Sequence, residues 1–138
     1  MNERAHQLKS MRPEFSASLI NEKMSEEERF QNLVLRPVIK FQHDLLMQVF
    51  RNYIKKHKNV FYELSVEKRI AYIENAIHKN MKFRNSIKGM IIGLFTVEEY
   101  SLYATNSSAL NKRMMNIVKE RFLSNIQLFD NPEFLQAV

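Results

Sequence analysis

Two groups of basic residues are the features of this sequence that could most clearly bind a ligand. The first lies between residues 36 and 58 and holds six basic residues against one acid, Asp44: Arg36, Lys40, Arg51, Lys55, Lys56 and Lys58. The second spans residues 79–88 and holds four basic residues and no acid: Lys79, Lys82, Arg84 and Lys88. Charge gathered in this way creates a local field that a dispersed net charge of +6 would not. The two groups therefore predict an anionic partner.

A helix over residues 37–57 would place Arg51 and Lys55 one turn apart, with Lys58 close by. We therefore predict the strongest positive patch at Arg51, Lys55, Lys56 and Lys58, with the 79–88 group as a second patch. Lysine and arginine suit phosphates because each neutralised phosphate releases bound counterions. The competing interpretation is a solvated surface that only promotes solubility.

Aromatic residues are interleaved with these charges: Phe41, Phe50, Tyr53 and Phe83. If they were exposed, their rings would stack on unpaired bases. All of them fall on the predicted apolar helix faces, however, which favours a position in the core.

A helix-turn-helix is a second way to build a nucleic-acid surface. Residues 97–104 would form its first helix, and the helix from Ser108 would enter the groove with Lys112, Arg113, Lys119 and Arg121. The connection has no glycine, and the second helix is longer than a usual reading helix. Two packed helices of a bundle are the favoured alternative, and the four residues are secondary candidates.

The sequence predicts no catalytic, metal or cofactor residues. None of its four histidines, His6, His43, His57 and His78, stands at a metal-binding spacing from another. Glu74 and His78 lie one helical turn apart, but a catalytic zinc normally takes three protein ligands. Cysteine, a glycine-rich phosphate loop and a nucleophile elbow are all absent from the sequence. A binding protein is therefore favoured over an enzyme.

The elements that must position these residues are helices. The chain has 138 residues, enough for one domain, and its two glycines and three prolines favour long helices with short connections. Apolar residues recur at helical spacing, and capping boxes begin at Ser25 and Thr96. We predict an all-α bundle of four to six helices around a central helix over residues 37–57. Pro37 either begins that helix or kinks a longer one.

Two finer expectations concern the later helices. The last helix is predicted to carry its apolar side as far as Phe129. Gly89 and Gly93 would form a flat notch, most simply where another helix crosses closely.

Residues 1–24 mix both signs of charge and are predicted to be a flexible, solvated arm, with the helical domain over residues 25–138. The longest apolar run has six residues, 90–95, whereas a membrane span needs about 20. We therefore expect no membrane span. A signal-peptide stretch is not evident, and the lack of cysteine permits a reducing compartment. The expected location is the cytoplasm.

Three stretches carry a resemblance to known proteins: residues 35–42, 83–89 and 106–116. They are similar to a small family of uncharacterised bacterial proteins whose members are often labelled glyoxalase. The resemblance covers roughly residues 25–129. The label implies a metal-dependent lactoylglutathione lyase built from βαβββ units. This sequence has neither the strands nor the metal ligands of that pattern, so no catalytic residue is assigned from it.

The leading hypothesis is a non-catalytic helical protein that binds an anionic macromolecule, either nucleic acid, an RNA–protein assembly or an acidic protein. The alternative is a helical adaptor or complex subunit with an apolar protein–protein interface. Eight methionines, with Met47 predicted off the main apolar stripe, support that alternative. A glyoxalase-type lyase is the remote third hypothesis.

Overall fold

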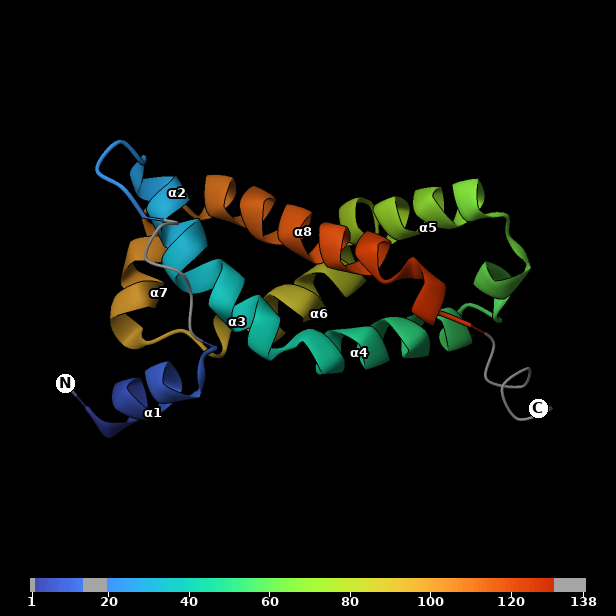
Figure 1. Ribbon diagram of the computed structural model, residues 1–138. Coiled ribbons are helices and arrows are strands. Elements are labelled where there is room, and N and C mark those ends of the chain that lie inside the picture. Colours follow the sequence, from blue (N-terminus) through green and yellow to red (C-terminus); the bar gives the residue numbers. More distant parts are fainter. Residues whose placement is uncertain (1, 14–19, 131–138) are drawn as a thin grey trace.

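The structure is a computed structural model that describes residues 2–13 and 20–130 (Figure 1). Those residues form helices and no strand, which confirms the all-α prediction. The helices are more numerous than the four to six expected. They are α1 (Glu3–Met11), α2 (Glu26–Phe30), α3 (Arg36–Phe41), α4 (His43–Lys56), α5 (Val66–His78), α6 (Met81–Ile92), α7 (Val97–Ala104) and α8 (Ser107–Ser124). No helix in the described ranges is long and apolar enough to cross a membrane.

Pro37 lies within a continuous helical stretch. A π-helical turn, Gln31–Leu35, joins α2 to α3, and the amide of Arg36 donates to the carbonyl of Gln31 five residues earlier. In a regular α-helix the proline ring would clash with the carbonyl four residues before it. The wider turn relieves that clash without ending the helix. The structure therefore resembles the second predicted alternative, a single longer helix altered near Pro37.

The predicted central helix over residues 37–57 is wrong in its first part. The backbone leaves helical geometry at Gln42, where φ is −85° and ψ is 4°, and α4 begins one residue later. The side-chain Nε2 of Gln42 donates to the carbonyl of Met90 in α6 at 2.9 Å. This tertiary bond accompanies a break that lacks the usual glycine or proline signal.

The core centres on Phe50, whose side chain is fully buried. Its ring centroid lies 4.8 Å from that of Phe122, 4.9 Å from that of Phe129 and 5.6 Å from that of Phe61. The prediction that the last helix extends to Phe129 is wrong, because α8 ends at Ser124. A short 3-10 turn, Ile126–Leu128, follows and carries Phe129 into the core.

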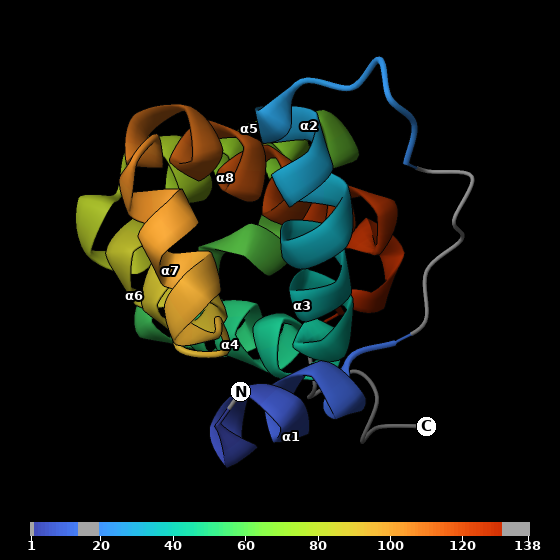
Figure 2. The same cartoon turned by 90° about the vertical axis from the view of Figure 1, so that its left-hand side faces the viewer.

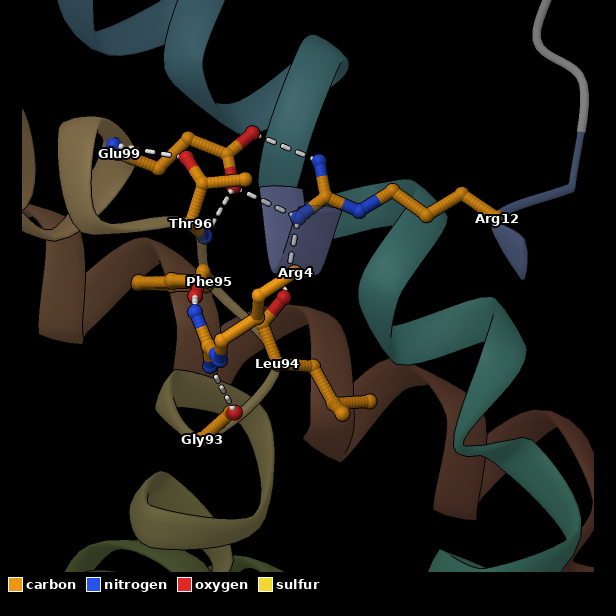
Figure 3. Close-up of polar contacts among 7 residues, drawn as sticks. All are labelled: Arg4, Arg12, Gly93, Leu94, Phe95, Thr96 and Glu99. Carbon is orange, nitrogen blue, oxygen red and sulfur yellow. Dashed lines mark hydrogen bonds and ion pairs between the residues drawn. The ribbon is translucent and has the colours of Figure 1, made fainter. Parts of the chain in front are cut away.

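Helix α1 covers nine of the 24 residues expected to form a solvated arm, of which residues 1 and 14–19 lie outside the described ranges, and it packs below α3 and α4 in the view of Figure 2. Arg4 donates to the carbonyls of Gly93 at 3.1 Å and Phe95 at 2.9 Å, and Arg12 donates to that of Leu94 at 3.0 Å (Figure 3). The last carbonyls of a helix have no partner within that helix. Arg4, within α1, and Arg12, directly after it, therefore supply partners to carbonyls at and just beyond the C-terminal cap of α6.

Arg12 also forms a buried ion pair with Glu99 (Figure 3). Its two terminal nitrogens donate to the two carboxylate oxygens at 2.6 Å each. Glu99 accepts from the amide of Thr96 at 2.8 Å and donates its own amide to the Thr96 hydroxyl at 3.1 Å, which confirms the capping box predicted there. Burial alone would raise the pKa of Glu99, but the hydrogen bonds from Arg12 and Thr96 outweigh it and hold that pKa below its ordinary value.

The expected close crossing of a helix at Gly89 and Gly93 is wrong. A Cβ added at Gly89 would meet no atom within 4 Å, and one added at Gly93 would meet the carbonyl oxygen of Gly89, within the same turn, at 3.0 Å. The carbonyl of Gly93 is instead one of the groups that Arg4 contacts.

The C-terminal end of α4 closes with a Schellman motif built without glycine. The amide of Asn59 donates to the carbonyl of Ile54 at 3.0 Å, and that of Lys58 donates to Lys55 at 3.2 Å. Lys58 and Asn59 both have positive φ, 63° and 60°. Asparagine tolerates this left-handed conformation, whereas lysine does so at a cost.

We expect Lys58→Gly to raise the free energy of unfolding by about 0.5–1 kcal/mol. Glycine removes the left-handed penalty, and its greater freedom in the unfolded chain cancels part of the gain. Urea unfolding followed by circular dichroism measures the change. Lys58→Ala is the matched control, because alanine removes the same charge and keeps the strain. Equal stability of the two variants would contradict the expectation.

Candidate anion-binding groove

The four residues of the first predicted patch do not share one face of α4. Lys55, Lys56 and Lys58 are exposed, but Arg51 is half-buried. The Arg51 Nη2 donates to the carbonyl of Leu128 at 3.4 Å, and its guanidinium carbon lies 5.7 Å from the centroid of the Phe129 ring. Residues five apart on a helix point about 140° away from each other. Arg51 therefore faces the chain after α8, while Lys56 faces α6.

Lys56 lines a groove between α4 and α6 with a volume of about 600 Å³. Lys82, from the second basic group, lines the same groove, so the structure unites two residues that the sequence placed in separate patches. The remaining lining residues are amides, a hydroxyl, rings and apolar side chains: Gln48, Val49, Asn52, Tyr53, His57, Asn80, Phe83, Ser86 and Met90. None of the described residues that line it is an aspartate or a glutamate.

Three aromatic rings form a series on the wall of this groove. The ring centroid of Tyr53 lies 4.1 Å from that of His57 and 4.2 Å from that of Phe83. Phe83 is buried, Tyr53 is half-buried and His57 is exposed. The tyrosine hydroxyl accepts from Nδ2 of Asn80 at 3.2 Å. The series therefore runs from the core to the surface.

Of the four aromatic residues expected in the core, Phe50 and Phe83 are buried there. Tyr53 is half-buried, and the expectation is wrong for Phe41, whose side chain is 43% exposed at the end of α3. The sequence does not identify His57 as a groove residue, because the spacing of histidines bears on metal binding and not on an aromatic surface. The position of His57 at the end of a basic helix was the available signal.

The second basic group is also divided. Lys79 lines an open depression beside the groove, with Tyr72 and Asn75. Arg84 lies instead where α5, α6 and α8 meet. Burial lowers the pKa of His78, and the charges of Lys119 and Arg84 lower it further, against the opposing effect of Glu74. Arg84 and Lys119, a secondary candidate, therefore both lie near His78. Lys88 follows Arg84 by one helical turn.

The four secondary candidates point to different surroundings. Arg113 lies 3.5 Å from a carboxylate oxygen of Glu27 and donates to Oε1 of Gln31 at 3.1 Å. Arg121 contacts Nδ1 of His43 at 3.1 Å, and burial, together with the charge of Arg36, lowers the pKa of Arg121. Lys112 is exposed on α8. Arg113 and Arg121 therefore already have partners within the protein, as expected for packed helices.

An apolar depression lies apart from the basic groove, at the α2 and α7 end. It has a volume of about 290 Å³ and is lined by Phe30, Leu33, Val34, Leu102 and Leu110, with Glu26 and Glu27 among the polar residues around them. Met47, which the sequence suggested as part of an apolar interface, is buried in the core at 4% exposure. That part of the prediction is wrong.

In residues 2–13 and 20–130, no three histidine, aspartate or glutamate side chains gather in a way that would hold a metal ion. Comparisons of the chain with protein-family models, curated proteins and solved structures found no match. The resemblance to the glyoxalase-labelled family therefore stays a prediction.

Proposed function

We propose that this protein is a non-catalytic binding protein that holds an anionic macromolecule, nucleic acid first, against the α4–α6 groove. The observation that carries the proposal is that Lys56 and Lys82 line one groove together with the amides of Gln48 and Asn52. Lysine neutralises phosphates, and side-chain amides donate to phosphate, sugar and base edges. A groove without lining carboxylates does not repel such a ligand.

The surroundings of the groove favour a polymer over a single small anion. Lys79 is exposed and lines a depression that shares Tyr53 and Asn80 with the groove, and Lys55 and Lys58 are exposed at the end of α4 and in the turn after it. Their field extends along the surface beyond the groove itself. Several phosphates of one strand can use that field together.

We expect the double variant Lys56→Gln/Lys82→Gln to bind a labelled single-stranded DNA about tenfold more weakly than the wild type at low salt. Each lost phosphate contact also lowers the slope of log affinity against log salt by about 0.7, so the slope should fall by about 1.4. Fluorescence anisotropy between about 50 and about 200 mM salt measures both quantities. Thermal unfolding should change little, because exposed charges contribute little to stability.

The matched control is Lys23→Gln/Lys68→Gln, which removes the same charge from two exposed positions outside the groove. An equal loss of affinity in both double variants would show that net charge alone is responsible. If the wild-type protein binds neither DNA nor RNA at low salt, the proposal is wrong.

The apolar depression favours a second candidate function, that of an adaptor with a protein partner. Helix α7 exposes three large apolar side chains at that end of the molecule, Val97 at 67%, Tyr100 at 51% and Leu102 at 57%. An apolar interface is insensitive to salt, whereas binding to phosphates is not. Association with a co-purified protein that survives high salt and disappears in Leu102→Asp supports this candidate.

A further inference from the structure

We infer that the α4–α6 groove takes a single strand of nucleic acid and stacks one unpaired base on the exposed face of His57. The inference rests on the proposed function and adds the form of the ligand. It begins with the ring series, in which buried Phe83 supports Tyr53 at 4.2 Å and Tyr53 supports His57 at 4.1 Å. A base placed on His57 would extend that series by one member.

The imidazole of His57 is held in place before any ligand arrives. Its Nδ1 lies 2.8 Å from the backbone carbonyl oxygen of Tyr53. A carbonyl only accepts hydrogen bonds, so Nδ1 carries the proton and donates. Asn80 fixes the tyrosine hydroxyl behind it at 3.2 Å. A platform ordered in advance loses little conformational entropy when a base binds.

The end of α4 also leaves this ring accessible. His57 is the C-terminal cap of the helix, and the left-handed conformations of Lys58 and Asn59 turn the chain immediately after it. Two lysine side chains line the same groove as this ring: Lys56, which precedes His57 in the chain, and Lys82 from α6. One nucleotide therefore finds an aromatic surface for its base and ammonium groups for its phosphates in one place.

The paired bases inside a duplex cannot use the aromatic part of this site. These bases are stacked on each other, and only their edges and the phosphates face outward. An unpaired base has a free face, and its stacking on a protein ring strengthens binding by roughly 5- to 150-fold. The groove should therefore prefer a single strand to a duplex, and a strand with bases to the same backbone without them.

The test compares three labelled DNA ligands over one common series of salt concentrations: a single strand of about 12 nucleotides, its duplex, and an abasic strand of equal length and charge. The variants are His57→Ala, which removes the ring, and His57→Phe, which keeps an aromatic surface. For the wild type we expect the single strand to bind about tenfold more tightly than the abasic strand. His57→Ala should abolish that advantage, His57→Phe should retain it, and the salt slope should stay the same in both.

The possible results separate this inference from the proposed function. If the wild type binds the strand with bases and the abasic strand equally tightly, the inference is wrong. If the affinity for DNA still depends on Lys56 and Lys82 in that case, the proposed function stands. If His57→Ala and His57→Phe lose the same affinity for the single strand and both show a lower salt slope, the effect comes from charge. That result also overturns the inference. If no ligand binds, both ideas fail. The comparison of ligands on wild-type protein stays decisive even if a variant unfolds.

Discussion

Truncation of Phe50 to alanine should lower the free energy of unfolding by about 3–5 kcal/mol. The side chain is fully buried, and its ring lies between neighbours from α8, from the turn after α8 and from the segment before α5. Alanine would leave a cavity that these rings cannot fill without moving away from one another. Since domains are typically stable by about 5–15 kcal/mol, this single change removes a large share of the total.

Urea unfolding at neutral pH measures the loss. Phe50→Leu keeps most of the volume and should cost clearly less than the alanine variant. Phe41→Ala is the matched control at a partly exposed phenylalanine, and we expect less than half of the Phe50→Ala effect there. If Phe50→Ala lowers the free energy of unfolding by less than about 1 kcal/mol, Phe50 is not the centre of the core.

Replacement of Arg12 by alanine should cost about 3–5 kcal/mol at neutral pH, because it leaves the carboxylate of Glu99 buried without its cation. The two side chains are only 10% and 11% exposed, so water cannot fully replace the lost contacts. Arg4→Ala, within the helix that Arg12 directly follows, is the matched control. Arg4 donates to carbonyls and has no buried carboxylate as a partner, so its loss should cost about 1 kcal/mol.

The pH dependence gives the Arg12 prediction a second readout. The pKa of Glu99 is lower in the folded protein than its ordinary value of 4.5, so the folded state favours the ionised carboxylate. Its contribution to stability is complete above that ordinary value and is lost as the pH falls through the lower, folded value. Without Arg12, burial of the carboxylate favours the protonated form. The stability gap between wild type and Arg12→Ala should therefore narrow in acid, and a constant gap would contradict the role of this ion pair.

The sequence was sufficient to predict helices wherever local signals and packing agreed. Apolar spacing located α4 and α8, and Thr96 with Glu99 marked the start of α7. Helix α1 escaped prediction because arginine bonds to distant carbonyls hold it in place, and such bonds leave no apolar period in the sequence. The break at Gln42 escaped for a similar reason, since its side chain bonds to Met90 in another helix.

The candidate site was predictable in its composition but not in its arrangement. Both basic groups are evident in the sequence, and each contributes one lysine to the α4–α6 groove. Which lysines meet depends on how α4 and α6 lie against each other, and helical periodicity alone does not contain that information. It also does not show that Arg51 turns toward Leu128, or that Arg113 already lies beside Glu27.

The attachment of α1 has a consequence for the order of events during protein synthesis. Arg12 is separated from Glu99 by 87 positions along the chain. At a synthesis rate of about 5–20 residues per second, α1 is made roughly 4–17 s before the acid that will pair with it. A helix of nine residues is only marginally stable alone in water. On the ribosome, α1 therefore has no docking partner at first, and it can dock only after residues 93–99 between α6 and α7 have been made.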